Sequence, residues 1–226
     1  SKPVLYTHTI SPAGRAVELT VKALNLDVDV REMNVFKGQH MSDEFKKLNP
    51  VQTIPTLDDN GFVLWDSHAI MIYLARRYGA ESGLYTEEYE QQARINAALF
   101  FESSILFARL RFCTDNLTEP VIYSGKSYFH SDRIEHIRKA YRLLEDSLVD
   151  QYMVGESLTI ADFSCISSIA TLVGVVPLDE SKFPKSTAWM RRMQELPYYE
   201  EANGTGALEL AEFVLGKKEA NASQFL

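Results

Sequence analysis

Cysteine is scarce in this sequence: Cys113 and Cys165 are the only two among 226 residues. Both lie in helical, apolar-rich stretches, so we expect buried free thiols in a reducing compartment rather than a disulfide framework. Long hydrophobic runs are missing too, since none approaches the roughly 20 residues of a membrane-spanning helix. Residues 1–6 predict a strand instead of a signal peptide. Together these features favour a cytoplasmic protein that does not use a membrane as partner.

Basic residues are also fewer than acidic residues. The 23 Lys and Arg residues are outnumbered by 31 Asp and Glu residues, which gives a formal net charge of −8. This balance argues against nucleic acid and anionic membranes as main partners. The five histidines and two cysteines show no metal-ligand spacing, so no metal is expected, and no Gly-rich phosphate loop occurs. The apolar fraction of 46% is enough for sizeable cores in one large domain or two modest ones.

The chain up to about residue 79 alternates between strand and helix patterns. The dipeptide Asn60-Gly61 predicts a tight hairpin between two apolar runs. The order strand, helix, strand, helix, strand, strand, helix is that of a thioredoxin-like α/β layer. The predicted segments are, in this order, residues 4–7, 12–26, 28–33, 41–48, 56–57, 62–65 and 67–78.

No segment after the glycine-bearing connector at 79–85 has a strand pattern. Residues 159–173 are apolar on almost every side, so they predict a buried helix at the centre of an all-α domain. Thr159 and Asp162 at its start form a variant capping box, which we interpret as structural. Residues 217–226 are polar and are expected to fray. The remaining predicted helices span residues 88–117, 132–151, 185–196 and 206–215.

Two short motifs flank the predicted hairpin. Thr53-Ile54-Pro55 precedes it, where the missing N–H of Pro55 does least harm and a cis peptide fits. A cis bond would turn the backbone of Thr53 and Ile54 outward, ready to pair with an extended peptide. Asp66-Ser67 follows the hairpin at the start of a helix. Its carboxylate, hydroxyl and free N–H groups can meet a small ligand that has both a carboxylate and an ammonium.

Several motifs occur in the order and spacing of one known family. They are Ser11-Pro12, Thr53-Ile54-Pro55, Asp66-Ser67-His68-Ala69-Ile70 and Leu158-Thr159-Ile160-Ala161-Asp162. By these motifs the chain resembles the cytosolic glutathione transferases, and most of all the insect delta and epsilon classes. The segments that favour epsilon over delta are residues 101–103, 106–112, 161–167 and 196–203.

The resemblance implies a thioredoxin-like glutathione-binding domain over residues 1–79. It also implies an all-helical domain over residues 87–226, with a hydrophobic substrate pocket. A homodimer is implied that adds glutathione, its co-substrate, to small hydrophobic electrophiles or dehydrohalogenates them, in detoxification and insecticide metabolism. Two rival interpretations are a non-catalytic carrier of hydrophobic ligands with the same fold and an interaction module.

Ser11 is the predicted catalytic residue. It stands just past the first strand and at the head of a helix, where a thioredoxin would carry two cysteines. A hydroxyl that donates to a thiolate, together with the positive end of a helix, lowers a thiol pKa from about 8.5 toward neutrality. Glutathione would then be the nucleophile. The alternatives are that Ser11 only caps the helix before Pro12, or that Tyr6 activates the thiol, as a strand tyrosine does in other classes.

The resemblance also assigns a set of glutathione-binding residues. Asp66 and Ser67 would bind the γ-glutamyl end, and Ile54 would pair main chain to main chain with the cysteinyl part. His40 and Gln52 would face the glycine carboxylate, although this chain has Gln52 where the epsilon pattern has a histidine. A solvated loop histidine is the alternative for His40, and a surface salt bridge is the alternative for Arg111. The full predicted set is His40, Gln52, Thr53, Ile54, Pro55, Asp66, Ser67, His68 and Arg111.

The predicted electrophile pocket is apolar, because charged groups would be desolvated there without compensation. Its candidate residues come from the segments around the first helix, the following loop and the long helix of the second domain. They are Ile10, Val35, Phe36, Phe107, Leu110, Phe112, Thr114 and Leu117. His8 lies near the pocket mouth and is interpreted as a packing residue.

Overall fold

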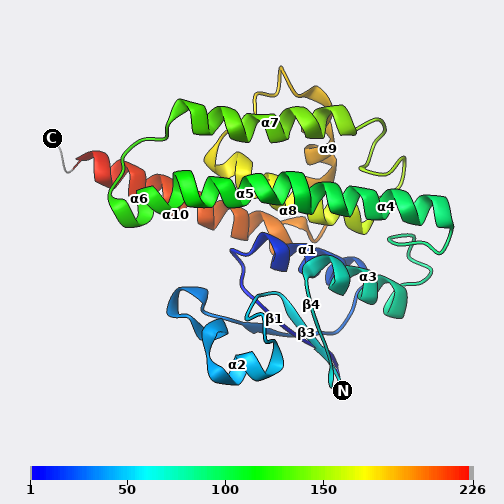
Figure 1. The fold of residues 1–226 in the computed structure, drawn as a ribbon. Coiled ribbons are helices and arrows are strands. Elements are labelled where there is room, and N and C mark those ends of the chain that lie inside the picture. The colour runs from blue at the N-terminus through cyan, green and yellow to red at the C-terminus, as the bar shows by residue number, and fades with distance from the viewer. Residues whose placement is uncertain (1, 224–226) are drawn as a thin grey trace.

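The computed structural model describes residues 2–223 and shows a small sheet beneath a larger helical layer (Figure 1). The sheet has the strand order β2-β1-β3-β4, with β1 and β2 parallel and the other pairs antiparallel. The predicted order of elements in this part is confirmed. The elements are β1 (Val4–Thr7), α1 (Pro12–Ala23), β2 (Asp29–Glu32), α2 (Asp43–Leu48), β3 (Thr56–Asp59), β4 (Phe62–Trp65) and α3 (Ser67–Tyr78).

The alternation of side chains along β1 decides which residues face the helical layer. Leu5 and Thr7 are buried, and a Cβ atom at Gly14 of α1 would collide with Thr7 Oγ1, so this face of β1 packs closely against α1. Tyr6 points the opposite way, and its ring packs edge-on against Phe45 of α2 at 5.7 Å between centroids. The sheet thus separates Tyr6 from the start of α1.

The second part of the chain is entirely helical among the described residues after Tyr78, apart from turns and one isolated bridge. Helix α8 is its buried centre, as predicted, and packs against α1, α4 and α10. The helices are α4 (Tyr89–Phe101), α5 (Phe107–Cys113), α6 (Glu119–Ser124), α7 (Ser131–Ser147), α8 (Ile160–Val175), α9 (Pro184–Gln194) and α10 (Thr205–Ser223).

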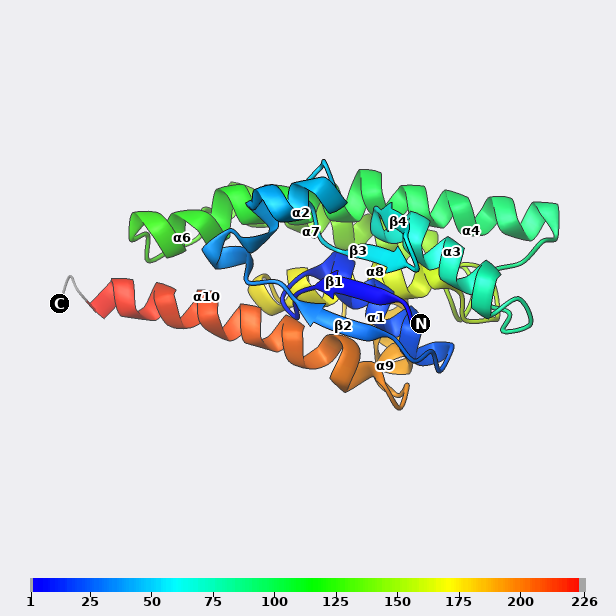
Figure 2. The same ribbon diagram turned by 90° about the horizontal axis from the view of Figure 1, so that it is seen from below.

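Two π-helical segments, Glu102–Leu106 and Thr114–Thr118, join α4, α5 and α6 into one continuous rod. The prediction of one long helix from residue 88 is therefore confirmed, with the end moved from residue 117 to Ser124. Figure 2 shows this rod and α10 flanking the sheet on opposite sides. The N-terminal part of α10 reaches the β1–α1 loop, because a Cβ atom at Gly206 would lie 2.1 Å from the Thr9 carbonyl oxygen.

The predicted end of the last helix is wrong. Residues 217–226 were expected to fray, yet α10 continues to Ser223, and residues 224–226 lie outside the described part. The Asn221 side chain donates hydrogen bonds to the carbonyl oxygens of Val121 and Lys126, at 2.8 and 3.0 Å. These tertiary contacts hold a polar helix end that local sequence preference does not support.

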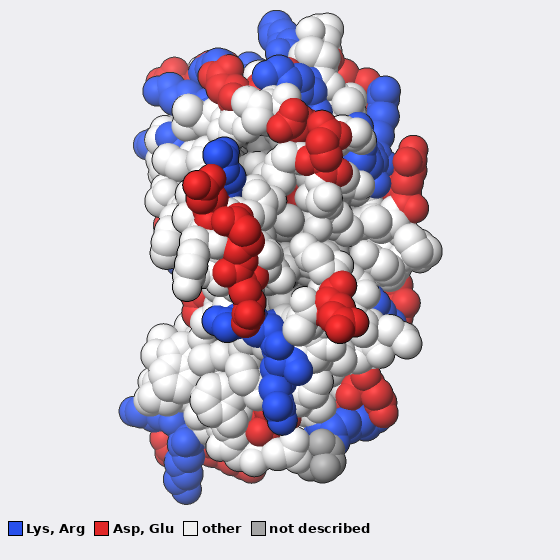
Figure 3. All heavy atoms as spheres, turned by 90° about the vertical axis from the view of Figure 1, so that its right-hand side faces the viewer, with Lys and Arg blue, Asp and Glu red and all other residues white. Residues whose placement is uncertain are grey.

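Figure 3 shows one face, on which acidic and basic side chains lie next to one another. Cys113 and Cys165 are both buried free thiols, as predicted. Among the described residues, no helix is long and apolar enough to span a bilayer. No group of three metal-ligating side chains comes together in residues 2–223.

Candidate active site

Ser11 lies in the loop that leaves β1 and caps α1. Its Oγ accepts a hydrogen bond from the Gly14 N–H at 3.1 Å, and its own N–H donates to the His8 carbonyl at 2.9 Å. Pro12 occupies the first helical position, where no N–H is needed. The cap uses the Ser11 oxygen only as an acceptor. The hydroxyl hydrogen is therefore still available as a donor to a second group.

The N-terminus of α3 is built around a strained residue. Asp66 has a φ of 73°, which is rare for a residue with a side chain. Its Oδ1 accepts hydrogen bonds from the N–H groups of His68 and Ala69, at 2.9 and 3.2 Å. Gln52, before the cis Ile54–Pro55 peptide bond, also has a positive φ, of 57°. Backbone strain of this kind concentrates where a ligand is held.

A first cavity of about 230 Å³, here called the polar cavity, lies between these two strained segments and the helical layer. The predicted residues Thr53, Ile54, Pro55, Asp66, Ser67 and His68 all line it. The remaining lining residues come from α1, the first π-helical segment, α5 and α8. They are Pro12, Ala13, Ala16, Glu102, Ser103, Phe107, Ser164 and Ser168.

A second cavity of about 300 Å³, here called the apolar cavity, adjoins the first. Pro12, Ile54 and Phe107 line both cavities, so the two are neighbours that share this wall. Ser11 lines the apolar cavity close to this junction. Of the predicted electrophile-pocket residues, the apolar cavity contains Ile10, Val35, Phe36, Phe107, Leu110 and Thr114.

Two predicted pocket residues lie elsewhere. Phe112 faces α7, where its ring centroid is 4.0 Å from that of His136. Leu117 is buried in the helical core, and the apolar cavity is lined by Thr118 instead. Side chains three and four residues apart share a helix face, which separates Phe112 from Leu110 and Thr114. Thr118, four residues after Thr114, lies on the cavity side of the helix, while Leu117 is buried in the helical core.

Three predicted glutathione residues lie outside the polar cavity. Arg111 lines the apolar cavity, has a side chain that is 64% exposed, and forms a long ion pair with Asp115 at 3.9 Å. This geometry is the surface salt bridge that was the alternative for Arg111. His40 and Gln52 line neither cavity, and Gln52 Nε2 donates to the His40 carbonyl oxygen at 3.4 Å.

Tyr6 is not brought to the junction of the cavities. Its hydroxyl accepts a hydrogen bond from Arg31 Nη1 at 3.2 Å, on the far face of the sheet. The Arg31 guanidinium also lies 5.6 Å from the Tyr6 ring centroid. Tyr6 therefore takes part in packing between β1, β2 and α2. Of the two candidate hydroxyl groups, those of Tyr6 and Ser11, only that of Ser11 lines a cavity.

The polar cavity contains a buried network that sequence reasoning missed. His68 Nε2 lies 3.0 Å from Glu102 Oε2 and 2.6 Å from Ser164 Oγ, and Ser168 donates a hydrogen bond to Glu102 Oε1. Glu102 is only 4% exposed and sits in the π-helical segment. The available signal for a buried Glu102 was its position shortly before the apolar residues 105–108. Spacing alone could not show that His68, 34 residues earlier, would contact it.

The apolar cavity also has wall residues outside the predicted set. His8, which was placed near the pocket mouth as a packing residue, lines it, with Nδ1 accepting the Ile10 N–H at 3.2 Å and the ring edge-on to Phe36. Cys113 lines it too, and burial raises the pKa of this thiol to about 12, so the sulfur stays protonated. The other unpredicted lining residues, mostly from α6, α8 and α10, are Glu119, Ile122, Tyr123, Thr171, Val175, Leu210 and Phe213.

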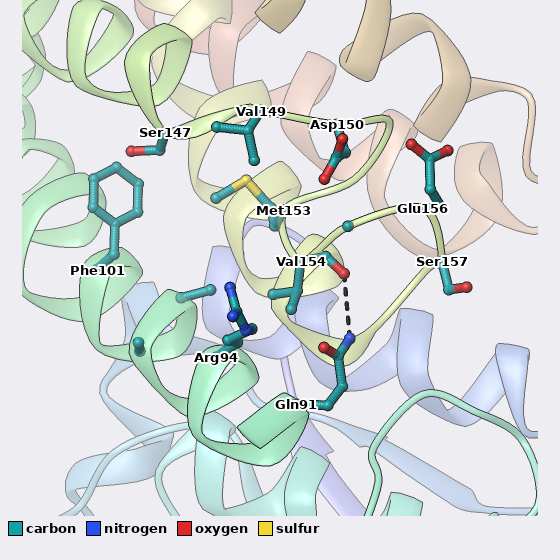
Figure 4. A pocket seen from close by; sticks show the side chains of 13 residues that line it. Gln91, Arg94, Phe101, Ser147, Val149, Asp150, Met153, Val154, Glu156 and Ser157 are labelled. Carbon is teal, nitrogen blue, oxygen red and sulfur yellow. Dashed lines mark hydrogen bonds between the residues drawn. The ribbon is translucent and has the colours of Figure 1, made fainter. Parts of the chain in front are cut away.

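A larger opening of about 540 Å³ lies away from both cavities, between α4 and the loop from α7 to α8 (Figure 4). Phe101 and Met153 form part of its wall, and Arg94 extends into it from α4. Gln91 Nε2 bridges its two sides by donating to the Val154 carbonyl oxygen at 3.4 Å. None of the predicted site residues lines this opening.

Known proteins resemble this chain over most of its length. Family models described as the N-terminal and C-terminal domains of glutathione S-transferase match residues 2–76 and 113–197. Glutathione S-transferase 1 from Manduca sexta is 40% identical over 204 residues, which cover 89% of this chain and 92% of that protein.

Solved structures show the same likeness. An epsilon-class glutathione S-transferase from the housefly, Musca domestica, has a TM-score of 0.89 and 41% identity, covering 96% of this chain and 98% of that one. A glutathione transferase homolog from Drosophila mojavensis, with bound glutathione, has a TM-score of 0.87 and 40% identity, covering 96% and 97%. The chain therefore belongs to the glutathione S-transferase family, in its insect epsilon/delta group. It is an enzyme that uses glutathione.

Proposed function

We propose that the enzyme conjugates glutathione to small apolar electrophiles, with Ser11 as the residue that activates the thiol. One observation carries this proposal: the polar and the apolar cavity meet at Pro12, Ile54 and Phe107, and Ser11 stands beside that junction. A ligand that spans the two cavities has its reacting atom near the Ser11 hydroxyl. The opposite orientation of Tyr6 supports the choice between the two hydroxyl groups.

The polar cavity suits the γ-glutamyl end of glutathione. The Asp66 carboxylate supplies charge for an ammonium, while Ser67 and the open N-terminus of α3 supply donors for a carboxylate. Ile54 lines both cavities, which suits the cysteinyl part of the ligand. For the glycine end we keep His40 and Gln52 as candidates, because Gln52 immediately precedes Thr53 of the polar cavity and its side chain bonds to the His40 carbonyl oxygen. His68 supports the cavity through Glu102 and Ser164.

The chemistry is activation of a nucleophile. The Ser11 hydroxyl donates a hydrogen bond to the thiolate sulfur, and the N-terminus of α1 adds a positive partial charge. Both favour the charged form and lower the thiol pKa. The thiolate then attacks the electrophile in the apolar cavity and displaces a leaving group or opens a strained bond. Elimination of hydrogen halide is a related route, in which the thiolate removes a proton and glutathione returns unchanged.

The apolar cavity points to apolar, aromatic or halogenated substrates. Phe36, Phe107, Leu110 and Phe213 offer no hydrogen-bonding groups, so a charged substituent would lose its hydration without compensation. Arg111 lies at the exposed rim and can meet a polar substituent or the glycine end of glutathione. Detoxification of such compounds, insecticides included, is the role that we propose for the enzyme. Cys113 and Cys165, both free, support a reducing compartment such as the cytosol.

Two measurements in sequence test the proposal. The protein should be retained on immobilised glutathione, and the eluted protein should conjugate an aryl halide such as a chlorodinitrobenzene. Retention without turnover would leave a carrier of hydrophobic ligands. Failure in both steps would leave an interaction module of the same fold. A structure with a glutathione conjugate bound would then place the thiol relative to Ser11.

A further inference from the structure

Arg15 is a buried cation that donates hydrogen bonds to the loop carrying Ser11. It lies on α1, one turn after Ser11, and is 1% exposed. Its Nη1 donates to two consecutive carbonyl oxygens of the loop, those of Thr9 at 3.1 Å and Ile10 at 3.0 Å. These are the last two carbonyl groups before Ser11.

The same guanidinium is anchored in the helical domain. Arg15 Nε donates to Asn203 Oδ1 at 2.9 Å, and Nη2 donates to the Ser167 carbonyl oxygen at 3.1 Å and to Thr171 Oγ1. Every N–H of the guanidinium thus has an acceptor, which is the fixed fork geometry that distinguishes arginine from lysine. The loop, α8 and the π-helical segment Glu200–Gly204 meet on this one side chain.

The bonds to the loop fix one peptide plane at both ends. The Ile10 carbonyl and the Ser11 N–H belong to the same planar peptide unit. Arg15 holds the carbonyl oxygen, and the His8 carbonyl oxygen accepts the N–H at 2.9 Å. With both ends held, the direction in which the Ser11 Cα and hydroxyl leave the plane is restricted.

Such a buried cation is costly for folding. None of the acceptors bonded to Arg15 is a carboxylate, and burial lowers the pKa of the guanidinium to about 10. It stays charged at neutral pH. An apolar side chain of similar volume would avoid the cost but could not hold two carbonyl groups. The contacts therefore fit a role in geometry better than a role in stability.

We propose that Arg15 is a positioning residue for thiol activation, which it serves by holding the Thr9 and Ile10 carbonyl groups against the helical domain and so setting the direction of the Ser11 hydroxyl. This inference rests on the proposed role of Ser11. Arg15 lines neither cavity, so it acts through the loop and not on the ligand.

The test uses the full-length enzyme with Arg15→Met and Arg15→Lys. In Arg15→Met, the pKa of the bound glutathione thiol should rise by about one unit, which corresponds to about a tenfold loss of turnover at pH 6.5. Turnover should recover above about pH 9, where the thiolate forms without help. The KM for glutathione should change little, because Asp66 and Ser67 lie on α3. Arg15→Lys keeps the charge and some donors, so it should lie between wild type and Arg15→Met.

Tyr141→Phe is the matched control for lost stability. It removes a buried hydrogen bond to the Val176 carbonyl oxygen, 2.6 Å long, and neither Tyr141 nor Val176 lines either cavity. It should lower the melting temperature and leave the pH profile unchanged. If Arg15→Met lowers turnover by the same factor at every pH, its role is merely structural and the proposal fails. If Arg15→Met does not fold, Arg15→Lys carries the same test.

A double-mutant cycle with Ser11→Ala separates this inference from the proposed function. If Arg15 acts through Ser11, then Arg15→Met should have almost no further effect on the thiol pKa in the Ser11→Ala enzyme. Additive pKa shifts would overturn the positioning role while leaving Ser11 in place. An unchanged pKa in Ser11→Ala alone would instead overturn the proposed function of Ser11, whatever Arg15 does.

Discussion

At the scale of single residues, the Ser11 hydroxyl has two tasks that use different atoms. The oxygen accepts the Gly14 N–H, and the hydrogen is left for the thiolate. Ser11→Ala should therefore raise the thiol pKa of bound glutathione. A hydrogen bond to a charged group contributes about 1.5–3 kcal/mol, so the expected rise is about one to two units. Thiolate absorbance titrated against pH measures it.

Tyr6→Phe is the control for that titration. The Tyr6 hydroxyl bonds to Arg31 across the sheet from Ser11, so its loss should leave the thiol pKa where it was. A pKa shift in Tyr6→Phe but not in Ser11→Ala would reverse the assignment of the activating hydroxyl.

Asp66 combines capping and ligand binding, and the two can be separated by substitution. Asp66→Asn keeps an acceptor for the His68 and Ala69 N–H groups but removes the charge that faces the ammonium. We expect the KM for glutathione to rise while the rate at saturation stays near wild type, because the lost contact is to a part of the ligand that does not react. Asp66→Ala should also lose about 1 kcal/mol of stability with the cap. A collapse of turnover in Asp66→Asn with unchanged affinity would contradict the assignment.

Glu18 makes stability depend on pH. Burial on α1 raises its pKa from 4.5 to about 7, against the attraction of Arg15 and Lys22, while Glu201 and Glu32 raise it further. The folded protein therefore holds this proton more tightly than the unfolded chain. The stabilisation is complete below about pH 4.5 and is lost as the pH rises through 7.

Glu18→Gln removes the carboxylate and should flatten this pH dependence. The variant should be more stable than wild type at pH 8 by about 1–3 kcal/mol, since one pKa unit is about 1.4 kcal/mol. At pH 5, close to the ordinary value of 4.5, the difference should be much smaller. Urea unfolding at the two pH values measures both, and an equal stability change at pH 5 and pH 8 would show that Glu18 titrates normally.

At the scale of elements, the sequence predicted best where one period or one motif decides the outcome. The order of strands and helices along residues 4–78 followed from alternation, the Asn60-Gly61 turn and Asp66. Alternation along β1 could also have shown that Tyr6 and Thr7 face opposite sides. The π-helical turns could not be predicted, because nothing local marks an added residue. In the second of them, Thr118 and not Leu117 lines the cavity.

The site was predictable where its residues are close in sequence and unpredictable where they meet across domains. Thr53 to Pro55 and Asp66 to His68 came from compact motifs. Glu102 and Ser164 reach the polar cavity only because α8 and the π-helical segment pack over α3. Arg15 was missed for the same reason, since its partners on α8 and on the π-helical segment Glu200–Gly204 come near it only after folding.

The start of α8 gives a prediction for an element. Asp162 is buried and accepts hydrogen bonds from the N–H groups of Met153 and Thr159, at 2.8 and 2.9 Å, and from Trp189 Nε1 at 2.9 Å. Asp162→Asn puts an amide nitrogen where an acceptor is needed. We expect a loss of about 2–4 kcal/mol in unfolding free energy, as for other broken buried networks. Folded Asp162→Asn should keep the wild-type thiol pKa, and a shifted pKa would give Asp162 a part in the site.

At the scale of the whole molecule, neither domain can form the site alone. The polar cavity joins α3 and the cis Ile54–Pro55 segment to α8, and the apolar cavity joins the Ser11 loop to α5, α6 and α10. Arg15 lies at the centre of this interface. We propose that the chain has two domains, residues 1–79 and 87–226. Catalysis then depends on how the two domains pack against one another.

The last prediction concerns a second copy of the chain. Figures 1 and 2 place the elements β4, α3 and α4 along one side of the molecule. Phe62 of β4 is 51% exposed, and Tyr89 and Phe100 of α4 are 86% and 69% exposed. Exposed large aromatic residues on neighbouring elements are typical of an interface. We expect the protein to sediment at micromolar concentration as a homodimer, twice the 25.7 kDa of the chain.

Phe100→Arg should raise the dissociation constant of the dimer by about tenfold or more, as loss of an interface anchor does. Tyr128→Arg, at a residue 52% exposed beyond α6, is the control and should leave the dimer intact. A wild-type protein that sediments only as the 25.7 kDa species would show that this side is free in solution.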